Sequence, residues 1–244
     1  MALEQRYKKA CKDLSARGCE TLRKDLEQAL RDDAKIVLAM RFDHLVPLAA
    51  NDRNIVTTFH QRVDAGVQIP EGNVWDQLRT TTEDRLFYNY KREIRFAALS
   101  LDGTGIKNFG ECSCTLRLNM VEHRTTLYEE NNVIFLAFRK KTGIKDDLPP
   151  GHRALWSKRT KLGVAKLAPY LDVGMSSSDF PTLVLTQAPD AKDASLIEAH
   201  IYGSVTIKGI ERVTIRRRNN RPFMSQLRAL KHDSAKHGVT LEWH

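Results

Sequence analysis

The sequence predicts an α+β fold in which a helical N-terminal part, residues 1–85, precedes a β-rich part, residues 86–244. In the first third of the chain Gly and Pro are almost absent, and apolar residues recur every three or four positions, which is helical periodicity. From about residue 92 the apolar period changes to two or to short runs. The 244 residues are 41% hydrophobic, which is enough to bury a core.

The first helical region is predicted over residues 3–48. Its periodic apolar positions are Leu14, Leu22, Leu26, Leu30, Ile36, Val37 and Met40. A second helix over 55–63 follows Asn51 and Asp52, which are good N-cap residues, and ends before the turn-rich segment 66–70. Residues 76–90 form either a further helix or the approach to a strand.

Short apolar runs bounded by turn residues predict the strands that follow. They cover residues 94–101, 111–118, 133–138, 182–186, 196–202 and 211–216. One helix over residues 152–170 interrupts them. Strands that follow an all-helical segment are typical of the α+β class.

Charge and apolar content restrict the partners. A net charge of +9 favours a polyanionic partner such as nucleic acid. No apolar run reaches the roughly 18 residues of a membrane span, and the N-terminus has no signal-peptide core, so we expect a cytoplasmic protein with no membrane partner. The four cysteines do not form a disulfide-scaffold pattern. Cys112 and Cys114 are expected to be reduced thiols, with a zinc site shared with a histidine as the alternative.

Dinucleotide-fold, P-loop, zincin and α/β-hydrolase motifs are absent from the sequence. Two other segments stand out, Phe109–Arg117 continuing to Glu122–Asn131, and Ser195–Val205 followed by Ile210–Val213. Together they resemble the catalytic domains of mono-ADP-ribosyltransferase toxins from bacterial polymorphic-toxin and toxin–antitoxin systems. The resemblance covers roughly residues 90–216. It implies an ADP-ribosyltransferase-like split β-sheet domain over residues 86–244, with a basic C-terminal segment.

By this resemblance Glu198 is the catalytic carboxylate, which stabilises an oxocarbenium-like centre as nicotinamide leaves NAD. Strand alternation puts Glu198, His200 and Tyr202 on one face, where Glu198 is alternatively an ordinary solvated residue. NAD is the expected substrate, and no metal is expected.

The residues that the resemblance assigns to NAD binding lie on two segments. They are Arg95, Arg124, Thr125, Thr126 and Tyr128, with Arg92 as the rival of Arg95. A guanidinium can pair with a diphosphate through two hydrogen bonds, and hydroxyls can bond a ribose or a phosphate. The alternative for Thr125 and Thr126 is a polar turn, and for Tyr128 it is core packing.

Two features of the sequence predict the acceptor: one departure from the residue pattern of the ADP-ribosyltransferase family, and two basic segments. Many protein-modifying relatives carry Glu or Gln two residues before the catalytic Glu, whereas Leu196 stands here, after an acceptor-recognition loop expected at residues 187–195. Lys and Arg gather in 139–166 and 212–231. We therefore expect a nucleic-acid acceptor, RNA rather than DNA. Its contacts are assigned to Trp156, Arg216, Arg217 and Arg218.

The leading hypothesis is thus a toxin or antiphage effector that ADP-ribosylates nucleic acid, with an acidic antitoxin or immunity protein as a second partner. One alternative is a metal-independent toxin nuclease that uses His123 or His200 as its base. Another is a non-catalytic basic module that binds nucleic acid.

Overall fold

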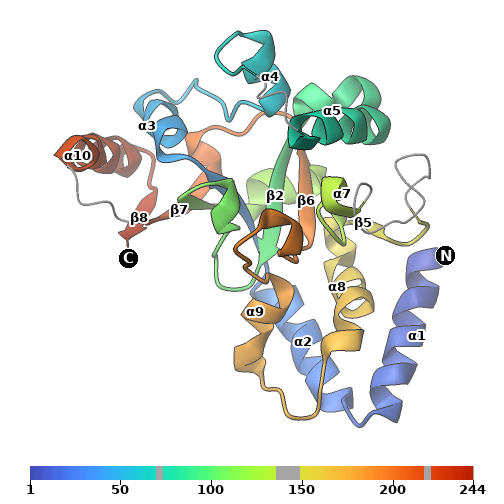
Figure 1. Cartoon of the computed structure of the whole chain (residues 1–244). Helices are drawn as coiled ribbons and strands as arrows, with labels where there is room; N and C mark the ends of the chain where they lie inside the picture. The colour runs from blue at the N-terminus through green and yellow to red at the C-terminus, as the bar shows by residue number, and fades with distance from the viewer. Residues whose placement is uncertain (70–73, 136–148, 217–220, 244) are drawn as a thin grey trace.

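In a computed structural model of the chain, eight strands of the described residues form one mixed sheet at the centre of the molecule (Figure 1). The structure describes residues 1–69, 74–135, 149–216 and 221–243. The strand order is β5-β4-β6-β2-β1-β3-β7-β8. All neighbouring pairs are antiparallel except β7 and β8, which are parallel. The strands are β1 (Lys35–Met40), β2 (Ile94–Ser100), β3 (Cys112–Leu116), β4 (Thr125–Tyr128), β5 (Arg153–Leu155), β6 (Glu198–Tyr202), β7 (Ile210–Ile215) and β8 (Thr240–Trp243).

Helices lie at both ends of the sheet (Figure 1). Helices α1, α2, α8 and α9 gather at one end, whereas α3, α4, α5 and α10 lie at the other. The bounds are α1 (Ala2–Ala16), α2 (Glu20–Asp32), α3 (Phe42–Ala50), α4 (Phe59–Asp64), α5 (Val74–Phe87), α6 (Leu118–Val121), α7 (Asn132–Ile134), α8 (Arg159–Leu167), α9 (Phe180–Val184) and α10 (Arg221–Lys236). A 3-10 helix, η1 (Tyr88–Glu93), connects α5 to β2.

The two faces of the sheet differ in burial. One face, here called the packed face, carries apolar side chains such as Leu38, Leu99, Cys114, Leu127 and Ile201. These residues belong to one hydrophobic core together with the inner sides of α1, α2, α8 and α10. Such burial is the main favourable term in folding.

The other face, here called the Glu198 face, carries Val37, Phe96, Ala98, Tyr128 and Glu198 in register across β1, β2, β4 and β6. It is less apolar, and the side chains of Phe96, Ser113 and Thr126 on it are only partly buried. This face is therefore where a site can lie.

The predicted α+β class, with helices first and the sheet later, is confirmed. The N-terminal helical prediction was wrong at one point, because Ile36, Val37 and Met40 lie on β1. Strand β1 hydrogen-bonds to both β2 and β3, so its short apolar run is that of a strand buried on both faces. Because β1 lies between β2 and β3 and pairs with both, the described strands form one continuous sheet instead of the split β-sheet that the resemblance implies.

Four of the predicted strands are found as β2, β3, β6 and β7, and the helix at residues 76–90 as α5 and η1. The helix at 55–63 begins only at α4, because Thr58 and Gln61 form a capping box there. The strand at 182–186 is replaced by the helix α9, whose first turn contains Pro181. The helix predicted at 152–170 was wrong at its beginning, where the chain forms β5, and the helix α8 begins only after β5.

The strand predicted at 133–138 begins instead in the short helix α7, where Asn131 caps the backbone N–H of Ile134; its residues 136–138 lie outside the described residues. Strands β4, β5 and β8 were not predicted. Since β4 has only four residues and β5 three, their apolar periods are too short to detect.

Candidate functional site

A buried carboxylate on β6 is the centre of the candidate site. Glu198 is only 3% exposed, and three groups contact its two oxygens. The Asn131 side chain donates to Oε1 (2.8 Å), the backbone N–H of Asn132 donates to Oε2 (3.1 Å), and Nε2 of His200 lies 2.7 Å from Oε2. These hydrogen bonds fix the carboxylate of Glu198 in position.

Strand alternation places His200 beside Glu198. Because His200 follows two residues later on β6, its ring lies on the same face, between Phe87 (ring centroids 4.9 Å apart) and Phe96 (5.3 Å). Its Nδ1 has no hydrogen-bond partner among the described residues. The Nε2 side of the ring thus faces the carboxylate, while aromatic rings flank the rest of it.

Tyr128 lies opposite Glu198 on β4, on the same face. Its hydroxyl is buried and has no partner in the part of the chain that the structure describes. Burial, together with the carboxylates of Glu129 and Glu198, raises the pKa of Tyr128 far above its ordinary value of 10.0. The phenol therefore remains protonated and can serve as a hydrogen-bond donor.

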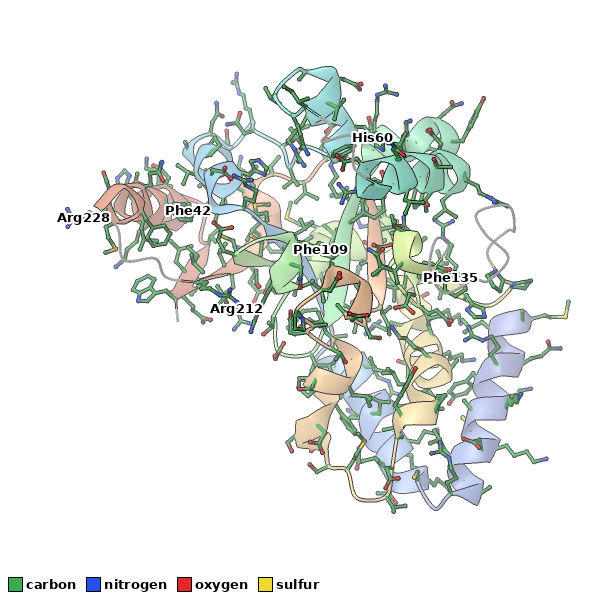
Figure 2. The ribbon with its side chains drawn as sticks, viewed as in Figure 1. Phe42, His60, Phe109, Phe135, Arg212 and Arg228 are labelled. Carbon is green, nitrogen blue, oxygen red and sulfur yellow. The ribbon has the colours of Figure 1, made fainter. Side chains whose placement is uncertain are left out.

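A cavity of about 580 Å³ opens beside Glu198. Such a volume is within the usual range of ligand sites, about 300–1,000 Å³. Its walls come from β1, β2, α4, α5, α7 and the segments around Phe109 and Ala191. In Figure 2, His60 marks the α4 side of this region and Phe109 the side nearer the middle of the sheet.

Four of the described arginines line the same cavity, and we call three of them, Arg41, Arg62 and Arg79, the arginine wall; the fourth is Arg95. Arg41 pairs with Asp43 (2.6 Å), and Arg79 lies 3.8 Å from Glu83. Arg62 donates to the backbone O of Thr57 (2.8 Å) and to the Gln68 side chain (2.8 Å), neither of which is charged.

The arginines of the wall are close enough to repel one another. Burial lowers the pKa of Arg62, and the charges of Arg79 and Arg41 lower it further. Burial and the charge of Arg62 also lower the pKa of the neighbouring His44. The wall thus has an excess of positive charge that an anionic ligand would neutralise.

Arg95 lies on the packed face, opposite Glu198, because it pairs with Ile201 on β6. Its guanidinium is buried and donates to the backbone O of Val56 (3.0 Å) and of Glu93 (3.0 Å) and to Gln61 (3.3 Å). Each of the three guanidinium nitrogens thus donates one hydrogen bond within the fold, although the residue borders the cavity. The alternative, Arg92, is exposed and pairs with Asp64.

Thr125 and Thr126 lie on the strand β4 and not in a turn, whereas Arg124 ends the short 3-10 helix that precedes β4. Arg124 donates to the backbone O of Met120, Tyr202 and Ser204, and Thr125 is buried on the packed face. Thr126, by contrast, lies on the Glu198 face next to His200. Among these residues only Thr126 and Tyr128 share a face with Glu198.

The residues assigned to nucleic acid are dispersed. Trp156 is 3% exposed and packs under the guanidinium of Arg159 (4.9 Å), so the prediction that it stacks on a base was wrong: its ring fills the core. Arg216 is exposed at the end of β7, and Arg217 and Arg218 lie outside the described residues. Helix α10 adds exposed cations nearby, among them Arg228 on its outer side (Figure 2).

Asn131, Asn132 and the arginine wall were missed as site residues. Asn131 stands at the end of a segment that the sequence singles out, and its asparagine pair was the available signal. The three arginines come from three separate segments, so no local motif joins them.

No group of three or more His, Cys, Asp or Glu side chains that could hold a metal ion occurs within the described residues. None of the four cysteines, all of which are described, forms a disulfide. No described helix has the length and apolar character needed to cross a membrane. A comparison with models of protein families gives no match to this chain, and neither does a comparison with curated proteins.

Proposed function

We propose that this protein is an NAD-dependent mono-ADP-ribosyltransferase whose catalytic residue is Glu198. One observation carries the proposal: a buried carboxylate, hydrogen-bonded to Asn131, Asn132 and His200, borders a ligand-sized cavity that the arginine wall lines. NAD matches this arrangement of charges. Its diphosphate is anionic and would face the arginines, and its ribose becomes cationic in the reaction and would face the carboxylate.

In the proposed reaction the bond between C1′ of the ribose and the nicotinamide nitrogen breaks, and its electron pair leaves with nicotinamide. Glu198 stabilises the resulting oxocarbenium-like centre by its negative charge. A lone pair of the acceptor then forms the new bond to C1′, and the acceptor releases its proton. The arginine wall holds the diphosphate during these steps, a role that we assign to Arg62 and Arg79 in place of Arg95.

We further propose nucleic acid as the acceptor, RNA before DNA, and a role as a toxin or antiphage effector in the cytoplasm. The net charge of +9 and the exposed cations of α10 support a polyanionic partner. The same charge suits an acidic antitoxin or immunity protein.

The geometry gives less support to a nuclease. His200 directs Nε2 at Glu198 and is enclosed by aromatic rings, and His123 is exposed and away from the lining of the cavity. A general base has to reach the attacking nucleophile, and neither histidine lines the cavity in which a substrate would lie.

The proposal is tested by incubating the protein with NAD labelled in its ADP-ribose part and with cellular RNA, DNA and protein. We expect release of nicotinamide and label on RNA, both reduced at least about a hundredfold by Glu198→Gln. Glu211→Gln, at an exposed position on β7, is the matched control and should retain full activity. Full activity of Glu198→Gln would refute the catalytic assignment, and cleavage of RNA without NAD would favour the nuclease.

A further inference from the structure

An exposed aromatic surface lies beside the site and is not used in the proposed function. Tyr202 ends β6 and is 50% exposed, and Tyr90 on η1 is 59% exposed; their ring centroids are 6.1 Å apart. Neither ring contributes to the hydrophobic core. We call this pair the tyrosine surface.

The tyrosine surface is rigidly supported. Phe87, which precedes η1, packs on His200, so the start of η1 is fixed to the Glu198 face. The next residue, Tyr88, has φ +40°, a conformation that bulky residues rarely adopt, and its side chain is exposed. The backbone therefore turns sharply to place η1 next to the end of β6, where Tyr90 meets Tyr202.

Positive charge accompanies the two rings. Arg124 donates to the backbone O of Tyr202 and Ser204, and within the described part of the chain its hydrogen bonds are to carbonyl groups, so these contacts do not neutralise its charge. Arg153 lies over the ring of Phe87 (5.5 Å) and donates weakly to Thr126 (3.4 Å), neither of which is acidic. Lys91 and Arg92, in contrast, pair with Asp84 and Asp64.

We propose that the tyrosine surface binds single-stranded nucleic acid, with bases stacked on Tyr90 and Tyr202 and phosphates near Arg124 and Arg153. Exposed rings beside cations form the usual platform for single strands, because every base has a π-face while the backbone is anionic. In a duplex the bases are already stacked on one another, so a single strand is the occupant that fits.

The surface also lies near the reacting centre. Tyr202 and Glu198 are four residues apart on one strand and on the same face, which places their Cα atoms about 13 Å apart. A strand held by Tyr90 and Tyr202 would thus pass close to the candidate active site. This part of the inference rests on the proposed function, since it assigns the tyrosine surface to the acceptor of that reaction.

The test measures binding of the full chain to a fluorescent oligouridylate of about 12 nucleotides by fluorescence anisotropy. We expect Tyr90→Ala and Tyr202→Ala to weaken binding about fivefold each and about 25-fold together, the lower end of the range for base stacking. Tyr→Phe at both positions should restore most of the affinity, because the ring and not the hydroxyl stacks. Tyr170→Ala is the matched control: Tyr170 is 60% exposed but lies on the segment after α8.

Unchanged binding by the double alanine variant, or tighter binding of duplex RNA than of the single strand, would overturn the proposal. So would equal losses in the phenylalanine and alanine variants. NAD turnover, measured on the same samples without nucleic acid, separates the two proposals. Tyrosine-dependent binding without any NAD turnover would refute the proposed function alone, whereas NAD turnover with tyrosine-independent binding would refute the tyrosine surface alone.

Discussion

At the scale of single residues, the Glu198 carboxylate is defined by what surrounds it. Asn131, Asn132 and His200 each form one hydrogen bond with it, so both oxygens are engaged, and the residue itself is almost completely buried. Charge interactions are strongest where water is excluded, so a carboxylate fixed in this way acts on a developing positive charge without having to reorganise.

Arg95 provides a prediction at the same scale. Arg95→Ala should lower the free energy of unfolding by about 1–3 kcal/mol, because it leaves the carbonyl of Val56 without its donor. The carbonyl of Glu93 also loses Arg95 but keeps the backbone N–H of Gly203. The measurement is denaturation by urea, with Arg92→Ala as the exposed control. A variant with unchanged stability but weakened NAD binding would instead support the assignment of Arg95 to NAD.

At the scale of elements, β1 and β3 approach each other closely beside Gly110. This glycine has φ +155°, and a Cβ built there would lie 2.3 Å from both C and O of Met40. Backbone atoms of a central strand cannot move aside as a flexible side chain can. Close approach of the β1 backbone thus explains why glycine precedes β3.

Gly110→Ala is therefore expected to destabilise the fold by at least about 2 kcal/mol. The measurement is the shift of the thermal unfolding midpoint. Gly174→Ala is the control, since the nearest atom to its added Cβ is 3.8 Å away. Equal stability of the two variants would show that β1 can shift.

Glu129 connects helix α1 to β5. Arg6 of α1 pairs with Oε2 (2.6 Å), and His152, just before β5, contacts Oε1. Burial alone would raise the pKa of Glu129, but the hydrogen bond from His152 and the charge of Arg6 outweigh it, so the pKa lies below the ordinary 4.5.

A lowered pKa means that the folded state favours the ionised form, so Glu129 stabilises the fold above pH 4.5 and loses this effect as the pH falls through its folded pKa. Glu129→Gln should thus be less stable than the native chain at pH 7, and the difference should shrink below pH 4.5. Denaturation curves at several pH values check this. A difference independent of pH would show that the contact of Glu129 with α1 is not electrostatic.

At the scale of the whole molecule, the cavity brings together segments far apart in the chain. Glu198 comes from β6, whereas the arginine wall comes from the end of β1, from α4 and from α5. The candidate site thus depends on the sheet order, in which β1 lies beside β2 and β2 beside β6.

Arg62→Ala should weaken NAD binding by about 1.5–3 kcal/mol, the scale of hydrogen bonds to charged groups, because Arg62 has no carboxylate partner among the described residues. Arg62→Ala should change the free energy of unfolding only slightly, whereas Arg95→Ala is expected to lower it. Isothermal titration with NAD checks the affinity, with Arg53→Ala as an exposed control. Unchanged NAD affinity in Arg62→Ala would remove the arginine wall from the proposed site.

Local patterns allowed several features to be predicted from the sequence. The period of two is a property of each strand alone, so it correctly placed Glu198 and His200 on one face of β6, and the change of apolar period separated early helices from later strands. The tertiary structure decided the rest. Ile36 and Val37 became strand because β2 and β3 offered hydrogen bonds on both sides, and Trp156 and Arg95 were buried by segments distant in sequence. The arginine wall exists only in the folded chain, because long-range packing and not spacing along the sequence determines which charges meet in a cavity.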